Sequence, residues 1–442
     1  MGETKARTLK GFRDYLPEVE IPRSRMLRRV VDVFESFGFS PLSTPALEYS
    51  EILLGKCGDE GDKLLYRFED NGGRDVALRY DLTVPLARVV AQHGHLDRPF
   101  KRYQIAPVWR AEKPARGRFR EFTQCDVDIV GEASVRADAE CMMVGIEVLN
   151  ACGVPNYEMR MNHRGVLDGM LDRAGITDEA QRLKTLRVLD KLDKIGRDGV
   201  TAELTEGVDL GARTIDSLFE IVERPVAGLG DLEALGDLFG ESERGRAGAE
   251  ALHELLGILE AAGHAEHVRV DLSIARGLDY YTGAIYETFI VGRENFGSVM
   301  SGGRYDELLG RFAKQSIPAV GICLGVDRLI SALIDLDLLE AGSGTSQAYI
   351  VLFDAADFGR NAALAQSLRK AGVAVEMGLS ARKLGKQFKS AERKGCRFVL
   401  MLGDDEVSQG VVQIKDLETG TQEAVEQAQA ASWLSGKIKH LS

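Results

Sequence analysis

Residues 100–130 read FKRYQIAPVWRAEKPARGRFREFTQCDVDIV, and this stretch decides how the fold is interpreted. Phe100–Trp109 and Phe119–Val130 are rich in aromatic and β-branched residues, which predicts two strands. The loop between them, Lys113–Gly117, is basic. The stretch therefore predicts a hairpin with a charged tip instead of a tightly packed turn.

A second short stretch, Arg276–Gly283 (RGLDYYTG), has the same character as the segment from Arg110 to Phe122. Both combine arginines, carboxylates and aromatic rings beside segments that read as buried strands. A solvated surface scatters its charges and a core excludes them, so this mixture fits neither. It is typical of a pocket that holds a polyphosphate together with a small polar ligand.

The composition is that of a soluble globular protein with room for two or three domains: 442 residues, 44% apolar and 28% charged. No apolar run approaches the roughly 20 residues that a membrane span requires. The first residues, Met1–Ala6, lack the apolar segment of a signal peptide. The six cysteines form no Cys-x-x-Cys pair, which favours free thiols and a cytoplasmic location.

The net charge of −12 hides two basic segments. Residues 98–120 contain eight basic side chains against the one acid Glu112, and residues 382–397 contain seven against Glu392. Such segments can bind phosphates locally while the rest of the surface repels them. For the second segment, an ordinary solvated helix face remains the alternative.

Other elements are predicted on either side of the hairpin. Residues 22–37 have helical spacing with Pro22 in the first turn, and 39–47 read as an edge strand because they contain two prolines. Strands at 64–68 and 74–80 flank the turn Asp70–Gly73, and a helix follows from Asp81. Strands at 268–272, 284–291 and 320–324 come later, the last one leading into a helix.

The chain divides into regions of different character. Residues 166–262 lose strand signals and show helical spacing, which predicts a helical insertion. Residues 341–346 have the composition of a linker, after which strands and helices alternate as β-α-β-α-β. The predicted organisation is a core over 1–165 and 263–340, the insertion at 166–262, the linker, and a small α/β domain over 347–442.

Common phosphate and metal motifs are absent. There is no Gly-x-x-x-x-Gly-Lys-Ser/Thr sequence, and Ser301–Arg304 lacks the spacing of a dinucleotide site. The paired histidines have no further Cys or His nearby to complete a metal shell, so no metal site is predicted.

Arginines are the remaining chemical signal. Phosphoryl and adenylyl transfer needs fixed cations on the phosphates, and a guanidinium binds phosphate oxygens in pairs. Four arginines occur where a predicted strand gives way to a loop or helix: Arg110, Arg118, Arg276 and Arg328. Phe122 offers a ring on which a base can stack. Each arginine could instead form a structural ion pair with Glu112, Glu121 or Asp327.

A second polar group suits an amine or an imidazole. A carboxylate can pair with an amino group or accept from an imidazole N–H, and a tyrosine hydroxyl can complete the contacts. The candidates are Asp81, Asp128, Gln124, Tyr280 and Tyr281. Turn-forming aspartates and core tyrosines remain the alternative for each residue taken alone.

These residues carry a resemblance to the class II aminoacyl-tRNA synthetases, and within them to the histidyl-tRNA synthetase family, over nearly the whole chain. Arg79–Arg88 (RYDLTVPLAR) and Arg276–Gly283 resemble the two histidine signatures of that family. The segment ending at Pro45 resembles class II motif 1, Lys101–Gly131 motif 2 and Gly321–Leu329 motif 3. The resemblance implies an α+β fold, with an antiparallel-sheet core, a helical insertion and a C-terminal α/β anticodon-binding domain.

The resemblance also implies residue roles. The implied ATP site is Arg110, Glu112, Arg118, Phe122 and Arg328. The implied histidine site is Asp81, Thr83, Gln124, Asp128, Arg276, Tyr280 and Tyr281. Arg110 and Arg276 are the implied catalytic residues, because both would hold the α-phosphate.

The implied activity is that of a histidine–tRNA ligase, in which ATP activates histidine as an adenylate that then passes to the 3′ end of histidine tRNA. ATP would bring Mg²⁺, and no permanent cofactor is implied. The implied tRNA contacts are Lys113, Arg116, Lys383, Lys386, Lys389, Arg393 and Lys394. A cytoplasmic homodimer is implied as well.

Three positions depart from the usual pattern of the family. Motif 3 has Asp327 in place of Glu, and this shorter acid is still expected to orient Arg328. Lys113-Pro114-Ala115 replaces Arg-Pro-Gln in the motif 2 loop, which leaves open how the tRNA acceptor end is read. Asp128 stands where many relatives have Glu.

Two other functions remain in competition. The regulatory subunit of ATP phosphoribosyltransferase resembles the same core without aminoacylation, but it typically lacks the C-terminal domain and parts of the histidine signatures. This chain keeps both, which favours the ligase. A class II synthetase for threonine or glycine is disfavoured by Arg276–Gly283, and a panel of amino acids distinguishes it.

Overall fold

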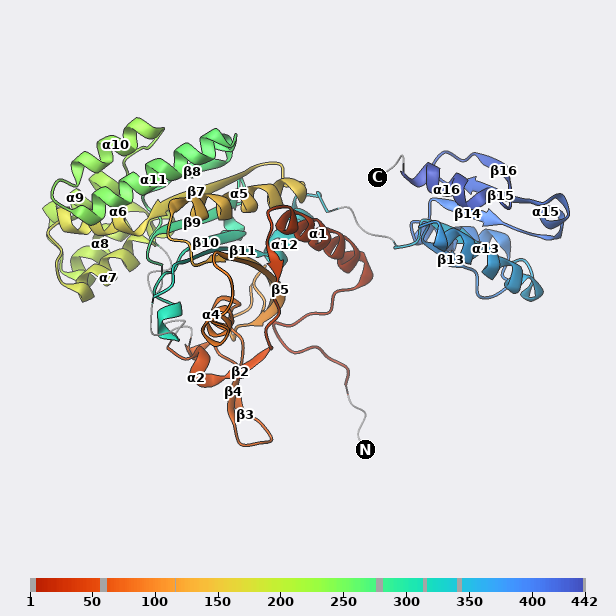
Figure 1. The fold of residues 1–442 in the computed structure, drawn as a ribbon, viewed down its shortest axis with the longest axis horizontal. Coiled ribbons are helices and arrows are strands. Elements are labelled where there is room, and N and C mark those ends of the chain that lie inside the picture. Colours follow the sequence, from red (N-terminus) through yellow and green to blue (C-terminus); the bar gives the residue numbers. More distant parts are fainter. Residues whose placement is uncertain are drawn as a thin grey trace. The chain divides into compact units, whose positions relative to one another are not determined.

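The computed structural model describes residues 5–55, 62–115, 117–275, 281–312, 316–339 and 344–439. The chain forms two compact units, one of residues 1–13 and 27–338 and one of residues 14–26 and 339–442 (Figure 1). None of the described helices is both long enough and apolar enough to cross a bilayer.

The larger unit is organised around an eight-stranded sheet with the order β1-β5-β6-β11-β10-β9-β7-β8. Its strands are β1 (Ser40–Pro41), β5 (Phe100–Trp109), β6 (Glu121–Val130), β7 (Tyr157–His163), β8 (Val268–Val270), β9 (Ala284–Ile290), β10 (Met300–Arg304) and β11 (Ala319–Gly325). From β5 to β7 in this order all neighbours are antiparallel, whereas β1 and β8 join the edges in parallel. The predicted antiparallel core is confirmed.

The predicted hairpin is formed by β5 and β6, and only Phe119 and Arg120 of the predicted second strand stay outside β6. Of the predicted edge strand 39–47, only Ser40–Pro41 forms β1, which does lie at a sheet edge; Leu47 begins β2 in another sheet. Helix α1 (Pro17–Ser36) starts earlier than predicted, so Pro22 lies inside it and not in its first turn. Pro17 and the acids Glu18 and Glu20 favour the earlier start, because proline and negative charge both suit the first turn of a helix.

A small sheet of order β2-β4-β3 carries the predicted turn Asp70–Gly73. Its strands are β2 (Leu47–Tyr49), β3 (Arg67–Glu69) and β4 (Asp75–Leu78). The other helices of this part are α2 (Ser50–Leu53), α4 (Thr83–Gln92), α5 (Val135–Ala151) and α12 (Val326–Asp335), with short 3-10 turns η1 (Ala265–His267), η2 (Glu294–Phe296) and η3 (Leu309–Arg311).

Between β7 and β8, where every residue is described, six α-helices follow one another (yellow to green in Figure 1). They are α6 (Arg164–Arg173), α7 (Glu179–Leu189), α8 (Leu192–Val208), α9 (Ala212–Val222), α10 (Leu229–Leu238) and α11 (Glu243–Ala261). Helix α11 packs on α6 and α10 and also on α5 of the core. The stretch expected as a helical insertion is thus helical, and α11 joins it to the sheet unit.

The smaller unit contains a five-stranded sheet of order β13-β12-β14-β15-β16. Strands β12 (Ala348–Ile350), β13 (Val375–Met377) and β14 (Phe398–Met401) are parallel, as the β-α-β-α-β pattern predicted. Strands β15 (Val411–Asp416) and β16 (Gln422–Glu426) add an antiparallel edge that was not predicted. Its helices are α13 (Phe358–Lys370), α14 (Leu384–Arg393), α15 (Asp404–Gln409) and α16 (Ala430–Lys439), with the 3-10 turn η4 (Ala355–Asp357).

Candidate active site

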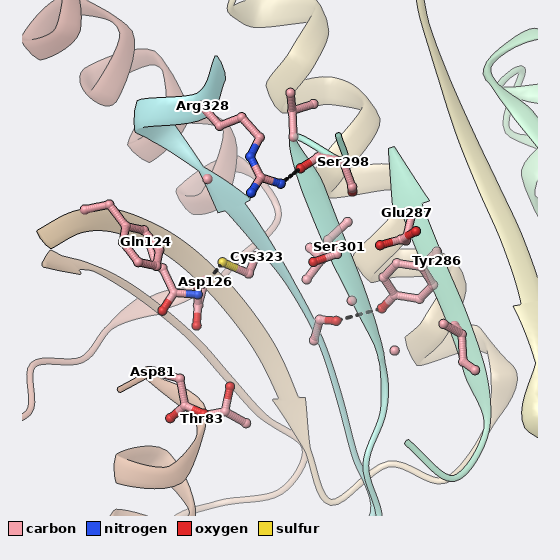
Figure 2. Close-up of a pocket in the computed structure, with 18 of the residues that line it drawn as sticks. Asp81, Thr83, Gln124, Asp126, Tyr286, Glu287, Ser298, Ser301, Cys323 and Arg328 are labelled. Atoms are coloured by element: carbon pink, nitrogen blue, oxygen red, sulfur yellow. Dashed lines mark hydrogen bonds between the residues drawn. The ribbon is translucent and has the colours of Figure 1, made fainter. Parts of the chain in front are cut away.

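A cavity of about 690 Å³ opens along strands β6, β9, β10 and β11 of the larger unit (Figure 2). Every described residue that was predicted for ATP or histidine lines it: Asp81, Thr83, Arg110, Glu112, Arg118, Phe122, Gln124, Asp128, Tyr281 and Arg328. Arg116, Arg276 and Tyr280 lie outside the described residues. Lys113 is exposed on the loop between β5 and β6 and is not among the lining residues.

One part of the cavity is acidic. Side chains alternate along a strand, so Gln124, Asp126 and Asp128 of β6 share one face, and all three line the cavity. Asp81 adds a carboxylate from the turn before α4. Its Oδ1 accepts a hydrogen bond from the Val84 N–H at 3.0 Å, which fixes the carboxylate at the start of that helix.

Asp128 is held by two neighbours. Its Oδ2 lies 2.7 Å from Nη2 of Arg102, a fully buried residue directly opposite on β5. Its Oδ1 accepts a hydrogen bond from the Tyr305 hydroxyl. Burial raises the pKa of Asp128, while Arg102 acts in the opposite direction. Oδ1 of the carboxylate predicted to bind an imidazole is thus hydrogen-bonded within the protein, whereas Oδ2 has the ion pair with Arg102 but no hydrogen-bond partner among the described residues.

Asp126 was missed as a site residue, although it lines the same cavity. Its side chain is 3% exposed, and Oδ1 has no hydrogen-bond partner among the described residues. Burial raises its pKa to about 7; Arg102 opposes this shift and Asp128 adds to it. The alternation along the predicted strand, with Gln124 and Asp128 on either side, is the signal that could have identified it.

Cys323 connects Asp126 to Gln124. It lies opposite Asp126 on β11, and its Sγ accepts a hydrogen bond from Gln124 Nε2 at 2.8 Å (Figure 2). The thiol also hydrogen-bonds the carboxyl group of Asp126. Because burial raises the pKa of Cys323 well above its usual value, the thiol stays protonated and can donate to Asp126.

The other part of the cavity is rich in arginine. The guanidinium carbon of Arg110 lies 4.3 Å from the ring centroid of Tyr80 and 5.1 Å from that of Phe122, and Nε donates to the Tyr80 carbonyl oxygen at 3.1 Å. Burial opposes its charge, but Tyr80, Asp81 and Glu112 together raise the pKa of Arg110 above its usual value. The ring of Phe122, which was predicted to stack on adenine, thus already contacts a permanent cation.

Two further arginines have partners in the protein. Arg118 forms an ion pair with Glu112, as the alternative of a structural pair anticipated, although its side chain is 57% exposed. Arg328 donates from Nη1 to the Ser298 carbonyl oxygen (Figure 2). Among the described residues, no three His, Cys, Asp or Glu side chains gather as ligands for a metal ion.

Asp327 ties separate segments together at this end of the cavity. Its Oδ1 lies 2.6 Å from Nη2 of Arg13, and its Oδ2 accepts the backbone N–H of Thr123 at 2.7 Å. The Arg13 guanidinium also lies 3.8 Å from the ring centroid of Phe119, which lines the cavity. Asp327 therefore holds the N-terminal segment against the hairpin, and its expected role in orienting Arg328 stays a prediction.

Glycines make room for the side chains of the cavity. A Cβ on Gly303 would lie 2.9 Å from the Tyr281 ring, and one on Gly321 would lie 2.2 Å from Oδ1 of Asp128. Strands β10 and β11 therefore need glycine at these positions. The sequence Ser301–Arg304 lacks the spacing of a dinucleotide site, and its glycines instead leave space for the side chains that line the cavity.

The helical stretch also reaches the cavity, since Arg187 and Asp190, at the C-terminal end of α7, are among its lining residues. So are Tyr286 and Glu287 of β9, and Tyr286 donates to the Gly321 carbonyl oxygen at 2.9 Å (Figure 2). These residues were not predicted. Arg187 and Asp190 carry no signal in the sequence, because charged residues near a helix end are also the usual pattern of a solvated surface.

The basic segment of the smaller unit forms α14 and its flanks. Lys383, Lys386, Lys389 and Arg393 are exposed, and the last three recur at helical spacing. Lys394 differs, because it pairs with Glu376 on the neighbouring strand β13. With Arg382, which is also exposed, the segment offers five exposed cations, two of which belong to the first two turns of the helix.

Comparisons with known proteins agree with this arrangement. The profile of the histidyl-tRNA synthetase family matches residues 11–329, and that of an anticodon-binding domain matches residues 347–437. The chain is 45% identical to a histidine–tRNA ligase of Rhodopirellula baltica over 93% of both proteins. It is 40% identical to that of Helicobacter hepaticus over 94% of this chain and 95% of the relative.

Solved structures show the same fold. A histidyl-tRNA synthetase from a Nostoc species superposes with a TM-score of 0.89 at 33% identity, covering 100% of both chains. A Bacillus halodurans protein described as an ATP phosphoribosyltransferase regulatory subunit/histidyl-tRNA synthetase has a TM-score of 0.74, covering 88% of this chain and 97% of its own. At 24% identity this second likeness concerns the fold alone.

Proposed function

This chain belongs to the histidyl-tRNA synthetase family and is a histidine–tRNA ligase, and we propose that the cavity described above is where it activates histidine with ATP. The observation that carries this proposal is the division of the cavity into an acidic and an arginine-rich part. Carboxylates such as Asp81 attract a cationic amino acid, and arginines such as Arg110 attract the phosphates of ATP. One cavity thus offers both charges that a reaction between these substrates requires.

In the acidic part, Asp81 and Gln124 bind the α-amino group of histidine, and Asp128 and Tyr281 contribute to the binding of its ring. Thr83 and Tyr280 complete this site. The fixed carboxylate of Asp81 at the start of α4 supports its assignment, because a rigid acceptor loses little freedom when the ligand binds.

In the arginine-rich part, Arg110 and Arg276 hold the α-phosphate, and Arg118 and Arg328 hold the β- and γ-phosphates. Adenine stacks on Phe122 next to Glu112. The exposure of Arg118 supports its role, since the side chain is free to turn from Glu112 to a phosphate. Class II synthetases use ATP with Mg²⁺, and in this chain the ion enters bound to the ATP phosphates.

These contacts position the reacting atoms for two steps. A carboxylate oxygen of histidine attacks the α-phosphorus, the bond to the β-phosphate breaks, and pyrophosphate leaves with the electron pair. Arg110 and Arg276 balance the charge that develops on the α-phosphate oxygens. The terminal ribose hydroxyl of tRNA then attacks the histidyl carbonyl carbon, and AMP leaves.

The tRNA is bound at two places. Lys113 and Arg116 contact its acceptor end, and residues 347–442 bind the anticodon, with Lys383, Lys386, Lys389, Arg393 and Lys394 directed to its phosphates. Residues 1–165 and 263–340 form the catalytic domain, 166–262 the insertion and 341–346 the linker. The enzyme works as a cytoplasmic homodimer, and light scattering at working concentration tests that assembly.

Amino-acid-dependent exchange between ATP and pyrophosphate, measured without tRNA across a panel of amino acids, tests the activation step. We expect exchange with histidine and none with threonine or glycine. A folded protein that binds histidine without exchange would point to the regulatory function that the Bacillus halodurans protein is named for.

A further inference from the structure

We propose that Asp126 is a further substrate-binding residue, whose free carboxylate oxygen accepts a hydrogen bond from the imidazole ring and selects histidine among amino acids. The inference rests on the proposed function, because it assigns one more contact in the same amino-acid site. It goes beyond the expected set of residues, in which Asp126 had no role.

The three carboxylates of the acidic part differ in the hydrogen bonds and ion pairs that they already make within the protein. Asp81 holds the first turn of α4 through Oδ1, and Asp128 is engaged by Arg102 and Tyr305. Asp126 has an Oδ1 that no described residue satisfies. A buried acceptor without a donor costs about 1–3 kcal/mol, so a ligand N–H at this oxygen removes an unfavourable feature of the empty site.

The position of Asp126 along β6 suits the length of histidine. Residues two apart on a strand are roughly 7 Å apart, and residues four apart are roughly 13 Å apart. With the α-amino group at Gln124, the ring of the same histidine extends to the neighbouring position, Asp126. Asp128 lies one position further, so Asp126 is placed beside the ring and Asp128 at its far end.

The groups that face Asp126 come from every element packed against it. They are Arg102 of β5, Cys323 of β11, Asp81 before α4 and Asp128 on the same strand. The cation and the thiol favour ionised Asp126, whereas burial and the two acids oppose it, and the pKa of about 7 is the balance. Ionised Asp126 accepts a charge-assisted hydrogen bond from the ring, and its protonated form is a weaker, neutral acceptor, so histidine binding weakens as the pH falls through 7.

The substitution Asp126→Asn tests this contact. Carboxamide and protonated carboxyl are both neutral and nearly equal in size, so the excess of wild type over variant should shrink to about 2- to 10-fold at pH 6, where roughly nine tenths of Asp126 is protonated. Above pH 8 we expect the wild type to exceed Asp126→Asn by about 10- to 100-fold in kcat/KM for histidine, the effect of one charge-assisted hydrogen bond. Histidine itself titrates in both experiments, so its own ionisation cancels in the ratio.

The measurement is pyrophosphate exchange from pH 6 to 9 at saturating ATP, with the KM for ATP determined in parallel. A ratio that is the same at every pH, or an equal rise in the KM for ATP, would overturn the proposal and make Asp126 structural. The exposed Asp97 serves as the control, since Asp97→Asn should leave both constants unchanged.

Cys323 provides an independent test if Asp126→Asn fails to fold. Its thiol lowers the pKa of Asp126, so Cys323→Ala should shift the midpoint of the wild-type pH profile upward, while Cys323→Ser keeps a donor and should restore it. An unmoved midpoint in Cys323→Ala would overturn the proposal. Absence of exchange with any amino acid in the wild type would instead refute the proposed function, whereas exchange with histidine and a flat ratio refutes the Asp126 contact alone.

Discussion

At the scale of single residues, the partners of Asp327 explain how a shorter acid can serve in this position. The carboxylate is 2% exposed and is shared between Arg13 of the N-terminal segment and the backbone of Thr123 at the start of β6. Arg13 in turn packs on Phe119. The segment around Arg13 thus supplies a cation that links the motif 2 loop to the helix carrying Arg328.

Replacing Arg13 should therefore act on the nucleotide. In Arg13→Ala we expect the KM for ATP to rise about tenfold, because one charge-assisted hydrogen bond contributes roughly 1.5–3 kcal/mol. The KM for histidine should change less than twofold, since Asp327 and Phe119, which Arg13 contacts, lie at the arginine-rich end of the cavity. Pyrophosphate exchange at saturating histidine measures the effect. Arg13→Lys should recover part of it, because it keeps the charge but not the forked geometry; equal increases in both KM values would contradict this role.

Asp126 and Asp128 show how far a site can be predicted residue by residue. Both are aspartates on the same face of a predicted strand, yet only Asp128 was chosen as a candidate site residue. Their different surroundings depend on the register that sets Arg102 opposite Asp128 and Cys323 opposite Asp126. Register between distant strands is a tertiary property. The sequence alone could therefore not show that Oδ1 of Asp126 lacks a hydrogen-bond donor within the protein.

At the scale of elements, the start of α6 couples stability to pH. His163 caps this helix by accepting the Gly165 N–H on Nδ1 at 3.0 Å. Burial lowers the pKa of His163 to about 4, and Arg304 adds to this shift. The unfolded chain, with an ordinary histidine pKa of about 6.5, binds the proton first as the pH falls. The contribution of His163 is therefore intact above pH 6.5 and is lost as the pH falls from about 6.5 to 4.

The substitution His163→Asn keeps a capping side chain but removes the titration. Between pH 7 and pH 5 we expect the wild type to lose about 2 kcal/mol more unfolding free energy than His163→Asn. Urea denaturation at the two pH values measures this difference. His95→Asn, at an exposed histidine, is the control and should follow the wild type. If wild type and His163→Asn had the same pH dependence, His163 would have the same pKa in the folded and in the unfolded chain, which would contradict this prediction.

The pairing of β11 with β6 depends on Gly321. An added Cβ would meet Oδ1 of Asp128 at 2.2 Å and the Val127 carbonyl oxygen at 2.7 Å. In Gly321→Ala we expect a loss of roughly 1–3 kcal/mol of stability and a higher KM for histidine, because the strand must shift beside the acidic part. Gly207→Ala in α8, where no atom lies within 4 Å, is the matched control and should be neutral or stabilising by about 1 kcal/mol. Thermal unfolding of both variants measures the change in stability, and pyrophosphate exchange measures the change in the KM for histidine.

Elements differed in how well they could be predicted. Strands β5 and β6 were found almost to their ends, because aromatic and β-branched residues mark them clearly. Strand β10 was not predicted, since its glycines at 302 and 303 have low strand propensity. They are required by the close approach of the Gly321 and Ala284 carbonyl oxygens and of two tyrosine rings, which are tertiary contacts. The helices of 166–262 were predicted as a region but not individually.

At the scale of the whole molecule, the smaller unit has a core of its own. Its largest cluster of buried apolar residues runs from Ala348 to Leu434, within the part that follows the predicted linker. The cavity is lined by residues of the larger unit alone. The linker at 341–346 stays a prediction from composition, and it places a truncation at residue 347, just before this core. The net charge of −12 concealed the basic helix of the smaller unit.

Deletion of residues 347–442 should therefore separate the two steps of the reaction. We expect pyrophosphate exchange with histidine to stay within about threefold of the full chain, because no lining residue is removed. Charging of tRNA should fall about 100-fold or more in kcat/KM, since the anticodon and phosphate contacts are lost. In the full chain, Lys386→Glu/Lys389→Glu should lower tRNA affinity, weaken its dependence on salt and leave exchange unchanged. If the truncated protein lost exchange and charging equally, the C-terminal unit would support the fold of the catalytic part. If the double variant kept its full tRNA affinity, α14 would be an ordinary solvated helix face.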